Sequence, residues 1–426
     1  MKKRSLLLAS ALLCAGLLSA CGGSKPEEGK KEGGEQQPAI DLKGDYAITV
    51  WQPKEAVNFT TALLNEYKAS VAKDGINLTF TVEEVGEGDA ASKMIEDVEK
   101  GADIYNFAQD QLARLVNAKG LSKIAGSRAT EVSERNDAGS VSAATVGDSL
   151  YAFPLTSDNG YFMYYDKSVI KESSLDSMEA VLADAKAANK LVSFNGTSAW
   201  YNAAYFFATG CTSEWTTDKT GEFVSYKDTY NSDKGVIAAK GLHALVNHDA
   251  YNDTSDAKAA FEKGSAVVVS GTWDYEKVKA ALGDNLGATK LPKFTVDGKS
   301  YQLGSFGGYK LVGVKPQTDA KRSLICSNIA NFLTDEAQQL KRFESLSWGP
   351  SNKVVQKNEK VLANPALKAL AEQSAYAIPQ GQFPQKWWDV AGAIASDLDD
   401  LEGTEEAIKG VLTNYEAAIA KLIVKE

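Results

Sequence analysis

The chain has 426 residues, and its 46 Lys and Arg against 56 Asp and Glu give a formal net charge of −10. A hydrophobic fraction of 44% and a charged fraction of 24% are ordinary for a folded protein and exclude a disordered or fibrous one. The acidic balance argues against nucleic-acid binding, which requires clustered Lys and Arg, and only two histidines disfavour histidine-based metal sites and catalytic triads. At roughly 100–200 residues per domain, the length predicts two or three domains.

Residues 1–20 have the pattern of a secretory signal peptide. Three cations over residues 2–4 precede an apolar stretch over residues 6–17 that is too short to cross a bilayer about 30 Å thick. Residues 18–21 (LSAC) resemble a bacterial lipobox, which implies that Cys21 is lipidated; ordinary cleavage that leaves Cys21 free is the alternative. Loss of the three cations leaves 43 cations against 56 anions, so the processed chain carries −13.

The segment over residues 21–40 is predicted to be a flexible tether. Residues 22–38 contain no aromatic or aliphatic side chain, so they cannot bury enough surface to offset the entropy of ordering. Two further cysteines, Cys211 and Cys326, are 115 positions apart without metal-ligand spacing. We expect two buried thiols, with a disulfide as the alternative.

The first part of the body alternates strands and helices. Strands are predicted at 46–51, 76–82 and 102–107, and the helices between them at 58–71, where Asn58 would be the N-cap, and at 89–100. Successive βαβ units of this kind predict a parallel sheet, in which ligands bind beyond the carboxyl ends of the strands. The loops Trp51–Glu55 and Phe107–Gln111 are therefore expected at one rim.

The alternation continues beyond residue 150. Further strands are predicted at 150–154, 161–165, 191–194, 266–270 and 309–314. Helices are predicted at 178–189, 198–209, 233–247, 274–281 and 320–333, and from about 335 the chain is expected to be almost wholly helical.

Four segments of the body form a specific combination. They are ADIY (102–105) with FAQD (107–110), YAFP (151–154) followed by YYDK (164–167), AFEKG (260–264) leading to SGTW (270–273), and IP (378–379) followed by WW (387–388). Together they resemble segments of bacterial extracellular solute-binding proteins of carbohydrate ABC transporters, most of all the maltose/maltodextrin branch. They occur in that family's order and at similar spacing from about residue 46 to the C-terminus.

The resemblance implies an α/β fold of two lobes with a hinge and a ligand cleft between them, the type II periplasmic-binding-protein fold. Lobe 1 would comprise 41–155 and 307–340, and lobe 2 would comprise 156–306 and 341–426. The protein would be a monomer without cofactor or metal that captures a sugar by hinge closure. Its partners would be the oligosaccharide, a membrane permease and, through the lipid anchor, the extracellular face of a cell membrane, with a Gram-positive surface favoured.

Aromatic side chains cover the apolar faces of sugar rings, and polar groups bind the rim of hydroxyls. By the resemblance, Trp273 and Trp388 match tryptophans that stack on sugar, and Phe107 stands where the family has an aromatic platform. Trp200, or Tyr201 beside it, follows a predicted strand. Trp387 is expected in the core, and Trp348 and Trp215 have no assigned role.

Four polar residues complete the candidate site. Asp110 matches a carboxylate that binds hydroxyls, with a helix N-cap as its alternative. Asp158 falls where the family has an acid in the hinge, although Asp-Asn-Gly is also a common turn. Lys54 and Glu55 lie in the first strand-to-helix loop, where family members often contact the ligand.

Two other classes stay open on the sequence alone. An exported glycoside hydrolase needs two carboxylates about 5–10 Å apart, and several acids could supply them. No nucleophile elbow, phosphate loop, dinucleotide fingerprint or zinc-protease motif accompanies them. The other class is a binding protein for a solute other than sugar. The types of residue that reach the cleft would distinguish it from a sugar-binding protein.

Overall fold

The computed structural model describes residues 40–218 and 222–423. The predicted signal peptide, Cys21 and the tether up to residue 39 lie outside the described residues, so the expectations for them stay predictions. Within the described residues, no helix combines the length and the apolar character needed to span a membrane.

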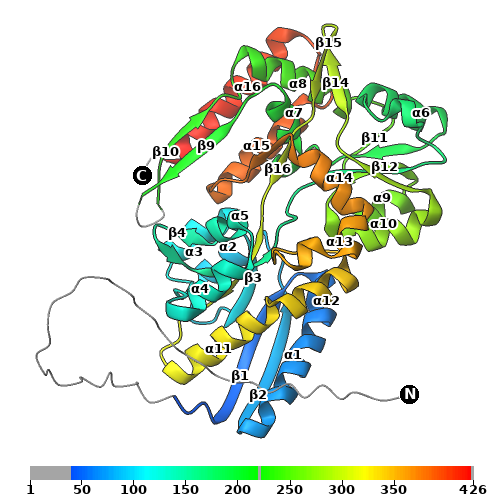
Figure 1. The fold of residues 1–426 in the computed structure, drawn as a ribbon. Coiled ribbons are helices and arrows are strands. Elements are labelled where there is room, and N and C mark those ends of the chain that lie inside the picture. Colours follow the sequence, from blue (N-terminus) through cyan, green and yellow to red (C-terminus); the bar gives the residue numbers. More distant parts are fainter. Residues whose placement is uncertain (1–39, 219–221, 424–426) are drawn as a thin grey trace, which may run out of the picture. The chain divides into compact units, whose positions relative to one another are not determined.

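A first mixed sheet contains five strands in the order β2-β1-β3-β17-β6 (Figure 1). The strands β1, β2 and β3 are parallel, as predicted, whereas β17 is antiparallel to both of its neighbours. The bounds are β1 Gly44–Gln52, β2 Ile76–Glu84, β3 Ile104–Ala108, β6 Ala152–Thr156 and β17 Lys310–Val314.

The longer helices around this sheet are stabilised by burying apolar side chains against it. In α1 (Val57–Val71) the buried Leu63 and Leu64 join the core, and α11 (Ala320–Leu333) contributes Ile325 and Ile329. The N-cap of α1 is Ala56 and not Asn58, so that capping prediction is wrong. The other elements here are α2 Ala90–Glu96, α3 Leu112–Asn117, α4 Gly126–Arg135, α5 Ala138–Ala143, the pair β4 Thr145–Val146 and β5 Ser149–Leu150, and α12 Glu336–Leu346.

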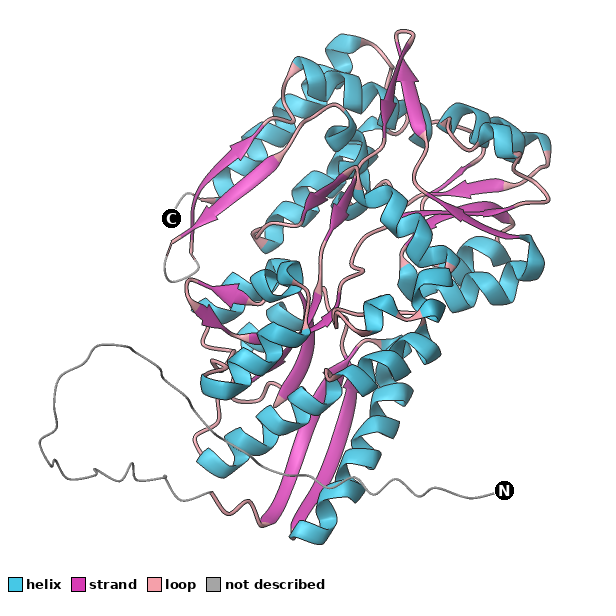
Figure 2. Cartoon of the chain, viewed as in Figure 1, coloured by secondary structure: helices cyan, strands magenta, loops and turns pink. Residues whose placement is uncertain are grey.

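A second five-stranded sheet has the order β11-β8-β12-β7-β13. Figure 1 labels its strands β11 and β12, and Figure 2 draws the strands of the molecule in magenta. The first three strands of this sheet are again parallel and its fourth, β7, is antiparallel to both neighbours. The bounds are β7 Phe162–Asp166, β8 Leu191–Ser193, β11 Tyr251–Asn252, β12 Ser265–Ser270 and β13 Leu286–Thr289. The helices that accompany it are α6 Met178–Ala187, α7 Ala199–Ala208, α8 Asp233–Val246, α9 Ala257–Glu262, α10 Tyr275–Leu282, α13 Glu359–Ala363, α14 Pro365–Ser374, α15 Gln385–Leu398 and α16 Glu405–Ile419.

Four small two-stranded sheets, β4–β5 among them, were not predicted. The other three are β9 Ser213–Thr217 with β10 Phe223–Asp228, β14 Lys293–Val296 with β15 Lys299–Gln302, and β16 Ser305–Gly307 with β18 Ala377–Pro379. The last pair is parallel and joins segments more than 70 residues apart, which local sequence cannot reveal.

Each sheet has its own hydrophobic core. Cys326 lies in the first core and Cys211 in the second, both as buried free thiols, so the disulfide alternative does not hold. We refer to the two sheets with their cores as the first and second lobe. Residues 41–426 form one compact unit, and the lobe boundaries expected from the sequence stay a prediction.

Candidate functional site

A cavity of about 410 Å³ lies between the loops of the two lobes. It is reached by the ends of strands from both sheets, which is the usual place for a ligand in α/β folds. Its lining residues are Glu55, Glu87, Gly88, Asp89, Ala108, Asp110, Gln111, Asn159, Ser198, Trp200, Tyr201, Trp273, Lys310, Gln380, Gln385 and Trp388. Six of the nine ligand-binding residues expected from the sequence are among them.

The first lobe supplies the charged wall of the cavity. Glu55 follows β1, Glu87 follows β2 and Asp110 follows β3, because the carboxyl ends of parallel strands meet at one edge of a sheet. The strand β17 runs the opposite way, so its first residue, Lys310, lies at this same edge.

Lys310 and Glu87 form a nearly buried ion pair, with Nζ and Oε1 3.4 Å apart and side chains only 6% and 12% exposed. Burial raises the pKa of Glu87 above its ordinary range despite the attraction of Lys310. For Lys310 burial opposes the charged form, but Glu87, Asp158 and Glu55 outweigh it and raise its pKa. The ammonium group also lies 5.1 Å from the ring centre of Trp273 and 4.2 Å from that of Trp348.

Asp110 is a buried acceptor that faces the cavity. It is 4% exposed, and its Oδ1 has no hydrogen-bond partner among the described residues. Burial raises its pKa to about 7, against the opposing effects of a backbone hydrogen bond and Arg114. The N-cap of α3 is Gln111, without a side-chain cap, so Asp110 does not serve as the N-cap of that helix.

The second lobe supplies the aromatic wall. Trp200 and Tyr201 lie in the first turn of α7, Trp388 in the first turn of α15, and Trp273 in a short 3-10 turn after β12. The rings of Trp200 and Trp388 are 6.3 Å apart at 50°, and Trp200 stacks on Phe306 at 4.9 Å and 15°. Because Phe306 is itself buried, this stack holds Trp200 in place while the indole stays half-buried at the cavity.

Two details fix which indoles reach the cavity. A Cβ on Gly271 would overlap the ring of Trp273, so glycine is required for that ring to fold back toward the strand end. Trp387 is fully buried and donates its indole N–H to the hydroxyl of Tyr415 at 3.1 Å, which leaves its neighbour Trp388 to line the cavity.

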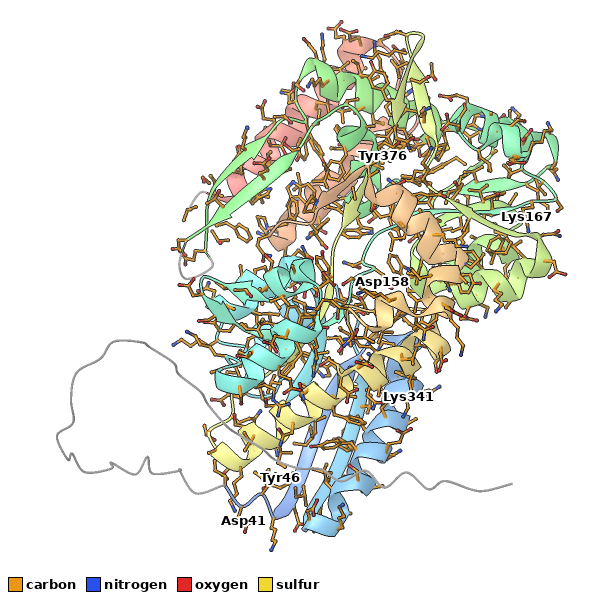
Figure 3. All side chains as sticks on the ribbon, in the orientation of Figure 1. Asp41, Tyr46, Asp158, Lys167, Lys341 and Tyr376 are labelled. Atoms are coloured by element: carbon orange, nitrogen blue, oxygen red, sulfur yellow. The ribbon has the colours of Figure 1, made fainter. Side chains whose placement is uncertain are left out.

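Three sequence-predicted residues do not line this cavity. Phe107 is fully buried in the first core beside Tyr105, with ring centres 5.8 Å apart. Lys54 is exposed beside Glu55. Asp158 is 2% exposed where the chain passes between the lobes (Figure 3), and it lines a separate cavity of about 480 Å³.

The Asp158 carboxylate joins segments that are distant in sequence. Its Oδ2 accepts hydrogen bonds from Thr272 Oγ1 and from the backbone N–H of Gly349, both at 2.5 Å. The other oxygen, Oδ1, is buried without a partner among the described residues. Asp158 therefore connects the segment that passes between the lobes to the turn that carries Trp273.

Several lining residues were not anticipated from the sequence. Glu87 and Asp89 lie in the loop after β2, and the strand-end rule that selected the loops after β1 and β3 could have found them. No local signal marks Lys310 or Gln380, because their place depends on an antiparallel strand and on a parallel pair between distant segments.

The comparison with protein families identifies the chain. Residues 62–369 match the family described as bacterial extracellular solute-binding protein, which is more than half of the sequence. The chain belongs to that family. A two-lobe solute-binding protein with a cavity between strand ends agrees with the fold class predicted from the sequence.

Individual relatives of this solute-binding protein bind oligosaccharides. It is 28% identical to the galactooligosaccharide-binding protein of Bacillus subtilis over 152 residues, which is 35% of this chain and only about a third (32%) of that protein's length. A structure solved with acarbose is 29% identical, with a TM-score of 0.76 over 88% of this chain and 98% of the other. The maltodextrin-binding protein MalE1 of L. casei, solved without ligand, is 19% identical with a TM-score of 0.72, covering 90% of this chain and 100% of its own.

Proposed function

We propose that this protein captures a maltodextrin-like oligosaccharide between its two lobes and delivers it to the permease of an ABC importer. The observation that supports this proposal is the pairing of a tryptophan-rich wall with a wall of carboxylates and one lysine. Indoles cover the apolar faces of pyranose rings, and charged groups form the stronger hydrogen bonds to hydroxyls.

Hydroxyl recognition has specific candidates in the cavity. Asp110 Oδ1 is a buried acceptor without a partner among the described residues, so a sugar hydroxyl would satisfy it. Lys310 has three N–H donors and lies beside Glu87, so the pair offers a donor and an acceptor next to each other. Trp273, Trp388 and Trp200 would stack on the rings.

The proposed binding step is closure about a hinge. A ligand that contacts both walls binds more tightly when the lobes are together, so binding shifts the population toward the closed form. The permease would then recognise the closed form, and lipidation of Cys21 would keep the protein at the outer face of the membrane. We propose no hydrolytic role, in keeping with a family of solute-binding proteins.

Calorimetric titration with a matched panel of glycans tests the ligand class. The protein without residues 1–40 is titrated with maltotriose, maltotetraose, a β-linked galactooligosaccharide, cellotriose and glucose. We expect heat of binding with the α-linked glucans. Binding only to the galactooligosaccharide would correct the linkage, and no response to any glycan at millimolar concentration would refute a sugar-binding function.

Tryptophan fluorescence and product analysis complete the test. Maltotriose should change the emission, because three of the expected contacts are indoles. Recovery of intact sugar after prolonged incubation is the expected result, whereas released glucose or maltose would support the hydrolase alternative.

A further inference from the structure

A six-residue segment of the second lobe, Gln380–Gln385, reaches across the cavity to the first lobe. Two contacts hold it at the second core. The N–H of Gln380 bonds the carbonyl of Gly307 at 2.9 Å, directly after the buried Phe306 of that core. Further along, the buried Phe383 of the same core stacks on Trp387 with ring centres 4.2 Å apart.

The side chain of Gln382 brackets the turn that presents Asp110. Its Nε2 donates to the carbonyl of Gln109 at 2.9 Å, and its Oε1 accepts from the backbone N–H of Ala113 at 3.0 Å. These two groups lie on either side of Asp110 and Gln111, both of which line the cavity. No side chain within α3 caps the start of that helix, so a residue of the other lobe satisfies one of its first N–H groups.

The neighbouring glutamines form further hydrogen bonds to the first lobe. We call these bonds, together with those of Gln382, the bridge. Gln109 Nε2 donates to the carbonyl of Gln380 at 2.6 Å. Gln385 Oε1 accepts from Arg114 Nη1 at 2.8 Å, and Arg114 is the residue that follows Ala113 in α3. The bridge is therefore made of neutral amides and one guanidinium, and its bonds can form only when the two lobes are together.

We propose that Gln382 is a positioning residue that couples lobe closure to the placement of Asp110. The inference rests on the hinge closure in the proposed function. When the lobes separate, the turn Gln109–Ala113 loses both bonds from Gln382. Asp110 is then no longer held by the opposite lobe, so the sugar meets a fixed acceptor only in the closed form. The bonds from Gln382 and the contacts of the sugar both favour the closed form. Each therefore strengthens the other.

The bridge also predicts a closed population that does not depend on sugar. Two hydrogen bonds of ordinary strength should change the closed-to-open ratio by roughly five- to 150-fold. The same factor should appear in the rate at which sugar leaves the closed protein, since release requires the bridge to break.

The experiment measures the distance between the lobes in solution. Spin labels are attached through Ala69→Cys on α1 and Ala280→Cys on α10, two exposed positions, while Cys211 and Cys326 are buried. Distances are recorded with and without maltotriose for the wild-type background, for Gln382→Ala, and for Gln382→Glu, which keeps the acceptor for Ala113 but loses the donor to Gln109. The matched control is Lys386→Ala, an exposed residue of the adjoining helix.

We expect Gln382→Ala to reduce the closed fraction and to speed maltotriose release by the stated factor, with an unchanged midpoint of thermal unfolding. Gln382→Glu should lie between this variant and the wild type, and Lys386→Ala should match the wild type. Identical distances and release rates for wild type and Gln382→Ala would overturn the proposal. If maltotriose does not bind but the distances shift, the sugar assignment fails while this inference stands.

Discussion

The two walls of the cavity differ in chemistry although the two sheets share one topology. Each sheet has three parallel strands, then a fourth that is antiparallel to both its neighbours. Within the described residues, the first lobe contributes every charged lining residue and the second every aromatic one. The fold thus provides two equivalent rims, and the residues at the strand ends decide what each rim binds.

This division explains how one site can hold an amphipathic ligand. A sugar ring has apolar faces and a polar edge, so a wall of indoles and a wall of charged groups address different parts of it. The two walls meet at Trp273, which follows a strand of the second sheet but packs against the first core and under Lys310.

The largest expected effect concerns the internal charge balance of the first wall. Lys310→Met leaves Glu87 without its cation, so we expect a loss of about 3 kcal/mol in the free energy of unfolding, measured by urea denaturation. The double variant Lys310→Met/Glu87→Leu should recover at least half of this loss, because it removes the unpaired acid. If Lys310→Met is as stable as the wild type, the ion pair between Lys310 and Glu87 does not stabilise the fold.

The aromatic wall should carry the next largest effect. Trp273→Ala and Trp388→Ala should each weaken sugar binding by roughly 2 kcal/mol, or about thirtyfold in Kd, through the loss of apolar contact. Calorimetry measures the Kd, and Tyr376→Ala, an aromatic residue that is 42% exposed, is the control. Unchanged affinity in either tryptophan variant removes that residue from the site.

Asp110 should make binding depend on pH. Its folded-state pKa of about 7 lies above the ordinary 3.8, so the folded protein holds this proton more tightly than the unfolded chain, and its contribution to stability falls as pH rises from about 4 to 7. Binding should change in the opposite sense, because the ionised carboxylate is the better acceptor. We expect affinity to rise about tenfold between pH 6 and 8, and Asp110→Asn to abolish this dependence. An equal slope in both proteins would contradict the role of Asp110.

The smallest expected effects on Kd concern Lys54 and Glu55, two neighbours in the loop after β1. Lys54→Ala should change Kd less than about twofold, since an exposed group outside the cavity contributes little. Glu55→Gln, at a cavity-lining position, should weaken binding by about two- to fivefold. A larger effect of Lys54→Ala than of Glu55→Gln would indicate that Lys54, and not Glu55, contacts the sugar.

The sequence predicted the elements of the body well where they are long and periodic. The helix expected at 320–333 matches α11 residue for residue, and the strand expected at 266–270 falls within β12. These segments bury an apolar pattern that can be read locally. The β9–β10 and β14–β15 hairpins were missed, because their strands are short and bury few residues.

The candidate site was predicted less completely. Glu55 and Asp110, in loops that the rule about strand ends selected, line the cavity, and so does Trp273, which the resemblance singled out. Phe107 does not line it, because its side chain packs into the core rather than past the strand end. Asp158 lies deeper than its turn-forming sequence suggests, since its carboxylate binds groups 114 and 191 positions away.

The amino-acid sequence by itself determined the α/β class, the residue types available at each strand end and the resemblance to solute-binding proteins. These depend on local periodicity and on short motifs. Only the tertiary structure decided that Lys310 pairs with Glu87 across 223 positions and that Gln382 reaches the turn of Asp110 from the other lobe. Such contacts depend on strand direction and on the packing of the two lobes, which no local pattern specifies.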